Sequence, residues 1–224
     1  MSLILGIVGA LLLLMATAGA VFGVIATFAM GRFLGQAPAV LRGAPPVTIL
    51  RPMKGLDPEA DANLQSLVEQ DYHGPVRIVL GADSEADPSI AAARRLQAAH
   101  PDRDIVIVAD GTQHGTNRKL SNLINMSAHA TGEILVISDS DVRLPPDGLS
   151  ALVGALEPEG VGLAYALYRG RPTGNLWSRL AALDINARFA ASVVMGQALN
   201  AHPVLGPTMA SRPTPWPGPA AWSG

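Results

Sequence analysis

Two carboxylates, Asp139 and Asp141, stand one residue apart directly after a short apolar run, residues 134–137. The length and β-branched content of that run predict a buried parallel strand. Ligands of open α/β sheets bind at the carboxyl ends of strands, so the pair would lie in a ligand-binding position. Two acids this close repel each other unless a cation lies between them, and Mg²⁺ or Mn²⁺ held by oxygen ligands commonly bridges to substrate phosphates. The pair therefore indicates a metal–diphosphate site; the alternative is an ordinary solvated turn, where Asp and Ser are common.

A second acid, Asp83, follows another apolar run at residues 76–81. If both runs are parallel strands, Asp83 and Asp139 line the same edge of one sheet, and carboxylates from two strands suit a nucleotide ligand. One acid would accept a hydrogen bond from a base or ribose, while the other would hold a phosphate-bound metal. The alternative for Asp83 is a turn or helix-capping residue.

Between these acids lies a third motif, residues 115–123. Gly115 permits a tight turn, and the polar residues after it open a helix whose N-terminus favours anions. Lys119 would then approach a nucleotide, and Asn117 and Asn122 would fix the loop. The alternative is simple helix capping followed by a solvated basic residue.

The elements that would position these motifs alternate between strand and helix. Apolar runs and helical spacing predict strands at residues 47–50, 76–81, 105–108 and 134–138, and helices at 59–70, 90–100 and 119–130. Strands separated by helices of this length predict an α/β fold with a doubly wound, mostly parallel sheet.

The N-terminus predicts a membrane anchor, residues 1–31. Leu3 to Met30 contains no charged residue and is long enough to span a bilayer. A cleaved signal peptide is the alternative, but the segment lacks a basic start and its apolar stretch is too long. Arginine and lysine follow the segment, at positions 32, 42, 51 and 54, so the rest of the chain is expected on the cytoplasmic side of the inner (cytoplasmic) membrane, with a single span. Residues 32–46, with three prolines (38, 45 and 46), are expected to be a short stiff linker.

Composition excludes some classes. The 224 residues include no cysteine, so disulfides and thiolate chemistry are absent, and the formal charge of −2 argues against a nucleic-acid partner.

Several ordered motifs together resemble the ceramide glucosyltransferase-like branch of the inverting, GT-A-fold glycosyltransferases of family 2. The resemblance covers roughly residues 1–209, and its motifs are Val47 to Asp57, Gln70-Asp-Tyr72, Ala82 to Pro88, Gly115 to Leu123, Ser138 to Arg143 and Val161 to Leu163. The bacterial hopanoid-biosynthesis members are most similar, notably at residues 168–170 and 176–199.

The resemblance implies a membrane-anchored enzyme that moves a sugar from a UDP-sugar donor to a lipid hydroxyl of a hopanoid or ceramide-like acceptor. By position, Asp83 would contact the uridine part of the donor, and Asp139 and Asp141 would bind the diphosphate through Mg²⁺ or Mn²⁺. The resemblance also implies that Lys54 and Lys119 help to position the nucleotide, and that Asn117 belongs to the donor-binding residues. Some eukaryotic members lack the second acid of the pair, so Asp141 is the less certain ligand.

Residues 176–199 mix large apolar side chains with Arg179, Asp184 and Arg188. The charges argue against a centred membrane span, and Trp177 and the arginines suit an interfacial helix that brings a lipid acceptor to the enzyme. The alternative is an amphipathic helix that covers the sheet.

The chain departs from the family after this segment. Inverting transfer needs a base to take the acceptor's proton, and the family has this acid after the interfacial helix. Here no Asp or Glu follows Asp184, so no catalytic base is identified. The family's later Arg-Trp motif, which helps to hold the diphosphate, is also missing from the sequence. The catalytic-type domain is expected to span residues 47–209, with a proline-rich irregular tail at 210–224. We interpret that tail as the product of truncation or a shifted reading frame.

Two alternatives stay open. The chain would be an inactive, membrane-tethered nucleotide-sugar binder, or a phosphatase of the haloacid-dehalogenase type, whose nucleophile motif also reads strand-Asp-x-Asp. The phosphatase leaves the Asn117 and Lys119 motif unexplained.

Overall fold

A computed structural model of the chain describes residues 2–36, 39, 41–201 and 203–212. The N-terminal helix and residues 167–204 form one compact unit, and the other described residues form a second, the α/β unit. Pro38 of the expected linker and residues 213–224 of the expected tail lie outside the described residues.

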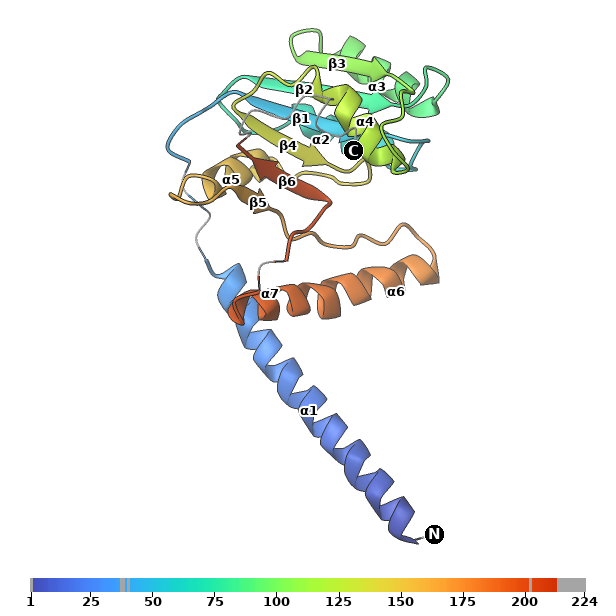
Figure 1. Cartoon of the computed structure of the whole chain (residues 1–224), viewed down its shortest axis with the longest axis vertical. Coiled ribbons are helices and arrows are strands. Elements are labelled where there is room, and N and C mark those ends of the chain that lie inside the picture. The colour runs from blue at the N-terminus through green and yellow to red at the C-terminus, as the bar shows by residue number, and fades with distance from the viewer. Residues whose placement is uncertain (1, 37–38, 40, 202, 213–224) are drawn as a thin grey trace. The chain divides into compact units, whose positions relative to one another are not determined.

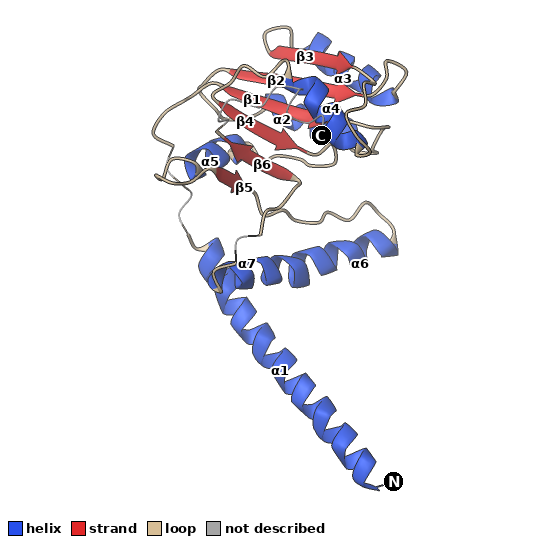
Figure 2. Cartoon of the chain, in the orientation of Figure 1, coloured by secondary structure: helices blue, strands red, loops and turns tan. Residues whose placement is uncertain are grey.

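The α/β unit is built on one six-stranded sheet with the order β3-β2-β1-β4-β6-β5 (Figures 1 and 2). The strands are β1 (Val47–Pro52), β2 (Val76–Ala82), β3 (Asp104–Ala109), β4 (Ile134–Ser138), β5 (Leu163–Tyr165) and β6 (Thr208–Ser211). The first four run parallel, and β6 pairs antiparallel with both β4 and β5. The expected mostly parallel sheet is therefore confirmed.

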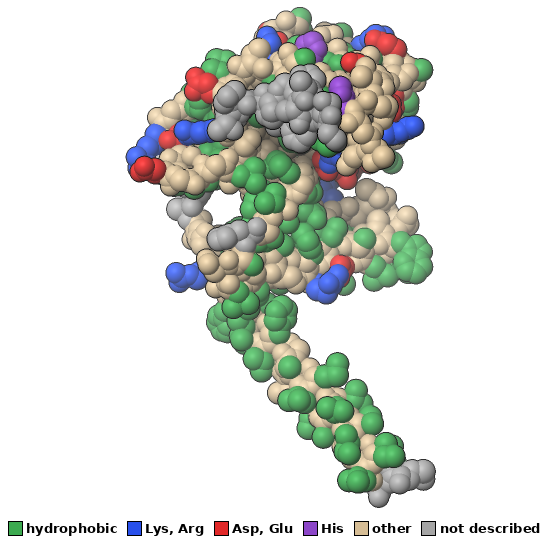
Figure 3. Space-filling view, viewed as in Figure 1, with side chains coloured by type: hydrophobic (Ala, Val, Ile, Leu, Met, Phe, Trp, Pro, Cys, Tyr) green, Lys and Arg blue, Asp and Glu red, His purple; other side chains and the backbone are tan. Residues whose placement is uncertain are grey.

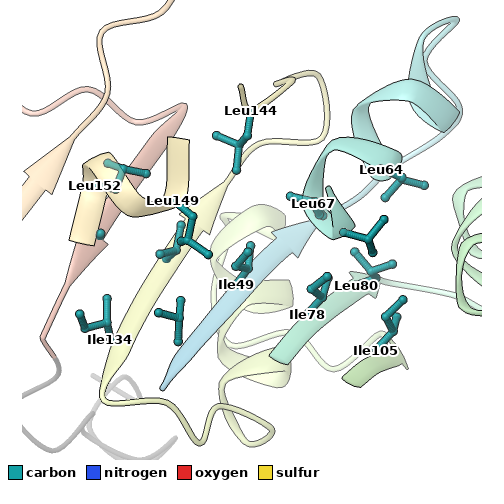
Figure 4. Close-up of a cluster of buried hydrophobic side chains, with 14 of the residues drawn as sticks. Ile49, Leu64, Leu67, Ile78, Leu80, Ile105, Ile134, Leu144, Leu149 and Leu152 are labelled. Atoms are coloured by element: carbon teal, nitrogen blue, oxygen red, sulfur yellow. The ribbon is translucent and has the colours of Figure 1, made fainter. Parts of the chain in front are cut away.

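Two helical layers cover this sheet. The helices are α2 (Ala60–Val68), α3 (Pro88–Ala99), α4 (Arg118–Ser127) and α5 (Gly148–Ala155). Side chains on one face of the sheet, including Ile49, Ile78 and Val136, pack with those of α2, α3 and α5 into the larger core (Figure 4). Alternate strand residues such as Leu50 and Val79 pack against α4 on the other face. Because both faces are covered, β1 is buried along its whole length.

The other unit is helical. It contains α1 (Ser2–Leu34), α6 (Leu176–Asp184), a π-helical turn η1 (Ile185–Phe189) and α7 (Ala190–Ala198), and α1 packs against α7. Asn186 in the π-turn ties the preceding loop by accepting from the Gly170 N–H at 2.8 Å and donating to the Gly170 carbonyl at 3.0 Å. The expected helix over residues 176–199 thus forms, with one π-turn in its middle.

Two boundaries differ from the sequence prediction. Residues 167–204 group with the N-terminal helix rather than with the α/β domain expected over 47–209, because their apolar helix α7 packs on α1. The irregular tail does not begin at residue 210, since Ala210 and Ser211 belong to β6 and pair with β4 and β5. Ala210 is fully buried.

Candidate functional site

A cavity of about 640 Å³ opens at the carboxyl ends of β1, β2 and β4. This is where the strand order reverses, because β2 and β3 lie on one side of β1 and β4 lies on the other. Such a reversal is the usual ligand position in doubly wound sheets. The lining residues are Pro52, Met53, Lys54, Gly55, Leu56, Asp57, Pro58, Asp83, Arg118, Lys119, Asn122, Asp139, Ser140 and Asp141.

The acid pair lies in a tight turn after β4. The Asp139 N–H donates to the Pro207 carbonyl at 2.9 Å, and the Val142 N–H donates back to the Asp139 carbonyl at 3.2 Å. Lys119, in the first turn of α4, places its Nζ 2.5 Å from Asp139 Oδ1. The structure therefore brings Lys119, Asp139 and Asp141 together in the cavity lining.

Asp83 lies across the cavity with two cations. Lys54 Nζ and Arg118 Nη1 are each 3.8 Å from its Oδ2 atom. Both basic side chains are about two-thirds exposed and free to turn toward a ligand, whereas the Asp83 side chain is only 27% exposed. The cavity is therefore lined by carboxylates and cations together.

The loop that carries Lys54 is held by Asp87. Gly55 adopts a positive φ of 68°, and its N–H donates to both Asp87 carboxylate oxygens at 3.0 and 3.1 Å. The same carboxylate caps α3 by accepting from the Ser89 N–H and hydroxyl. Burial alone would raise the pKa of Asp87, but these hydrogen bonds and the charge of Lys54 outweigh it and lower the pKa below its usual value.

The two asparagines of residues 115–123 have different positions. Asn117 is the N-cap of α4 and accepts from the Leu120 N–H at 3.1 Å, which is the capping alternative, and it is not among the cavity-lining residues. Asn122 does line the cavity and donates to the Gly81 carbonyl at 2.9 Å, while its Oδ1 has no partner among the described residues. Arg118 also lines it, although the sequence interpretation gave it no contact with the donor.

Arg51 is the residue near the site that sequence reasoning missed. In the sequence it is one of the basic residues that follow the membrane segment, whereas its side chain is fully buried beneath the acid turn. Burial lowers its pKa to about 10, against the opposing influence of Asp141 and Asp139, so it stays charged at neutral pH. The available signal was its position in β1, two residues after Ile49 on the same face of the strand.

The donor atoms suit a hard divalent cation shared with a ligand. Among the residues that the structure describes, no group of three or more Asp, Glu, His or Cys side chains is arranged to hold a metal by itself. Two carboxylates on one turn leave coordination positions open, which is how Mg²⁺ is usually held when substrate phosphates complete its shell. The residues present therefore fit Mg²⁺ or Mn²⁺ together with a diphosphate.

The family model for glycosyl transferase family 21 matches residues 11–214, nearly the whole chain. The chain belongs to glycosyl transferase family 21. The resemblance to ceramide glucosyltransferases is confirmed by this match, and the fold is the mixed α/β, GT-A type with a mostly parallel sheet. Because the chain belongs to this family, the alternative of a haloacid-dehalogenase-type phosphatase is set aside.

Curated relatives of the chain include ceramide glucosyltransferases. The chain is 38% identical over 114 residues to the enzyme of Komagataella phaffii, covering 49% of this chain and 22% of that relative. It is 30% identical over 105 residues to ceramide glucosyltransferase 1 of Caenorhabditis elegans, covering 47% of this chain and 22% of the relative. In both alignments the matched region is less than a quarter of the relative's length.

Among solved structures, the chain is similar to the mannosyltransferase PcManGT of Pyrobaculum calidifontis, which was determined in complex with GDP-Man and Mn²⁺. The TM-score is 0.57 and the identity 25%, over 88% of this chain and 54% of that one. This neighbour binds a nucleotide sugar together with a divalent metal.

Proposed function

We propose that this chain binds a UDP-sugar donor in the cavity at the carboxyl ends of β1, β2 and β4. The observation that carries the proposal is the meeting of Asp83, Asp139 and Asp141 with three basic side chains at one edge of the sheet. In a family 21 chain, that combination supports a donor site in which the diphosphate lies near the acid turn.

The residues take different roles in this proposal. Asp139 and Asp141 would hold Mg²⁺ or Mn²⁺ against the diphosphate, and Asp83 would accept from the uridine part. When bound, the metal supplies Lewis-acid stabilisation of the departing diphosphate. Lys119 pairs with Asp139 in the free protein and would donate to the diphosphate in the donor complex. Lys54 and Arg118 line the same cavity.

Asn117 has a supporting role. It caps α4, whose first turn carries Arg118 and Lys119, so it orients that turn rather than touching the donor. Of the two asparagines, Asn122 is the one that lines the cavity.

We further propose that the acceptor is a lipid and that the protein is anchored in the inner membrane. Among the described residues, α1 is the one helix long and apolar enough to cross a bilayer, and 33 residues at 1.5 Å each extend about 50 Å. Its hydrophobic side chains lie exposed along its length (Figure 3). On α6, Leu176, Trp177 and Leu183 are each at least 63% exposed, which favours an interfacial helix over one that covers a sheet.

Basic residues after α1 favour the cytoplasmic side for the α/β unit, although buried Arg51 no longer counts among them. The acceptor would be a hopanoid or ceramide-like hydroxyl, attacked with inversion at the anomeric carbon. No residue of this chain is assigned as the base.

The donor site is tested by titrating the purified chain with UDP in the presence and absence of Mn²⁺. We expect binding that Mn²⁺ strengthens, with the metal-dependent part abolished by Asp139→Asn and the total weakened by Asp83→Asn. Asp102→Asn is the matched control, since Asp102 is an exposed acid outside the cavity lining. UDP binding unchanged by both cavity variants would refute the donor-site assignment.

A second candidate is a nucleotide-sugar binder without transferase activity. It uses the same cavity residues and needs no base to take the acceptor's proton. Transfer of labelled sugar to extracted membrane lipid distinguishes the two, because only the enzyme forms a lipid-soluble product. Both candidates use the same donor site.

A further inference from the structure

Arg51 occupies a core position of the central strand. Val47 and Ile49 precede it on the same face of β1 and are buried in the larger core, and Arg51 itself has no exposed surface. A buried guanidinium is costly because its charge leaves water. An apolar side chain of similar volume would fill this position at a lower cost in folding free energy. The burial of a charge here therefore indicates a role beyond packing.

The contacts of Arg51 converge on the two ends of the acid turn. Its Nη2 donates to Ser138 Oγ at 2.9 Å and to the Val142 carbonyl at 3.0 Å. Ser138 directly precedes Asp139, and Val142 directly follows Asp141. One nitrogen of Arg51 therefore joins the residue before the acid pair to the residue after it.

The second terminal nitrogen of the guanidinium, Nη1, connects the turn to α2. Nη1 of Arg51 donates to the Asn63 carbonyl at 2.9 Å, and the Asn63 side chain reaches the Ser140 carbonyl at 3.4 Å. Ser66, one turn further along α2, donates to the same Asn63 carbonyl and accepts from the Leu144 N–H at 3.2 Å. The turn is thus held from below by β1 and from the side by α2.

The nearest negative charges to Arg51 are those of the acid turn. None of the ion pairs found among the described residues includes Arg51, so no carboxylate lies within 4 Å to neutralise it directly. Asp141 and Asp139 nevertheless act on it at longer range. Arg51 therefore forms no ion pair with either acid, and both acids line the cavity, where Asp139 pairs with Lys119.

We propose that Arg51 is a positioning residue that holds the Ser138–Val142 turn closed before any ligand arrives, so that Asp139 and Asp141 are presented as a pair to a divalent cation. The inference rests on the proposed donor site and deepens it. Arg51 touches neither donor nor metal and acts through the backbone and the Ser138 hydroxyl. A lysine would keep the charge, but its single ammonium lacks the planar fork that reaches three acceptors at once.

The test uses the whole chain in detergent with Arg51→Lys, and Arg77→Lys as the matched control on the neighbouring strand β2. Arg77 forms a surface pair with Asp104, outside the cavity lining. Hydrogen exchange is measured without metal or nucleotide, and Mn²⁺ affinity is measured in the presence of UDP. For Arg51→Lys we expect faster exchange confined to residues 138–144 and Mn²⁺ affinity lower by about 10- to 100-fold, the usual effect of losing a supporting contact around a metal. UDP affinity without metal and both properties of Arg77→Lys should stay unchanged.

Two results would overturn the proposal. Faster exchange spread equally over β1, β2 and β4 would make Arg51 a general stabiliser of the fold, and unchanged exchange at 138–144 would show that it does not hold the turn. Ser138→Ala, which removes one of the three acceptors, keeps the test decisive if Arg51→Lys does not fold. It should speed exchange at the same residues by a smaller factor, and unchanged exchange in this variant would also count against the proposal.

The exchange measurement needs no ligand, so it separates this inference from the proposed function. If the wild-type chain shows no Mn²⁺-dependent UDP binding, the donor site is wrong. The exchange result then still decides whether Arg51 closes the turn.

Discussion

Replacing Lys119 by methionine is expected to change metal binding and nucleotide binding in opposite directions. In the free protein the Lys119 ammonium lies 2.5 Å from an Asp139 oxygen, so it competes with a cation for that carboxylate. In the proposed donor complex the same ammonium would donate to the diphosphate. Methionine keeps an unbranched apolar side chain and removes the ammonium group with its charge and its donors.

The magnitudes follow from the exposure of the pair. The Lys119 side chain is 49% exposed and that of Asp139 26%, so their pairing is a surface-type interaction. Such pairs contribute about 0.2–1 kcal/mol, so affinity for Mn²⁺ without nucleotide should rise by about 1.4- to 5-fold. A hydrogen bond to a charged group contributes about 1.5–3 kcal/mol, and with this exposure we expect the lower end, a roughly tenfold loss of UDP affinity at saturating Mn²⁺.

The assay has two arms. Free Mn²⁺ is followed by electron paramagnetic resonance during a metal titration, and UDP binding is followed by calorimetry at saturating metal. Lys54→Met is the matched control, because Lys54 lies near Asp83 and should leave Mn²⁺ binding without nucleotide unchanged. A fall in Mn²⁺ affinity in Lys119→Met, or a UDP affinity that does not change, would show that the reasoning about Lys119 is wrong.

Three further substitutions test the supports of the site and the sheet. Asp87→Ala should destabilise the chain by about 1 kcal/mol through loss of the α3 cap and release the Gly55 N–H, as measured by urea unfolding. Because the folded pKa of Asp87 is lowered, its contribution is present above about pH 4 and is lost as the pH falls below that value, so the difference from wild type should shrink there. Gly132→Ala should cost about 1–3 kcal/mol, since an added Cβ would lie 2.5 Å from the Thr48 backbone nitrogen, and a thermal melt measures this. Tyr72→Phe should cost about 1 kcal/mol, because its hydroxyl donates to the Pro45 carbonyl at 2.6 Å.

Each of these has a contradicting outcome. A difference between Asp87→Ala and wild type that stays constant down to pH 2 would contradict the sign of the pKa shift. Gly162→Ala, where an added Cβ meets nothing within 4 Å, is the control for Gly132→Ala, and equal losses in the two would contradict the packing argument. A Tyr72→Phe chain as stable as wild type would show that the Pro45 carbonyl finds another partner.

The elements predicted well were those whose signal is local. Residues 134–138 form the predicted strand because an unbroken apolar run of that length suits a sheet covered on both faces. The helix expected at 119–130 occurs as Arg118–Ser127, since Asn117 caps its start. The acids at the strand ends meet in one cavity because parallel strands bring their carboxyl ends to one edge.

The missed features depend on partners distant in the sequence. Strand β6 has four residues, and its pairing is supplied by β4 and β5. The burial of Arg51 could not be predicted because its acceptors include two backbone carbonyls, of Asn63 and Val142. Every residue has such a carbonyl, so the sequence does not show which of them a buried arginine will reach. In the sequence, Asp87 is only an acid shortly after Asp83. In the structure its carboxylate accepts from the Gly55 N–H at 3.0 Å, nearly the same distance as from the Ser89 N–H at 2.9 Å in the cap of α3.

The place of β6 in the sheet also affects how the chain is made. β4 lies between β1 and β6, so its outer edge stays unpaired until the segment from Ser138 to Thr208 has been synthesised. At about 5–20 residues per second, that interval lasts several seconds. During this time an apolar strand with open backbone groups is a template for pairing with other chains. Nascent chains halted before Thr208 should therefore be more prone to aggregation, and need more chaperone capture, than chains halted just after Ser211.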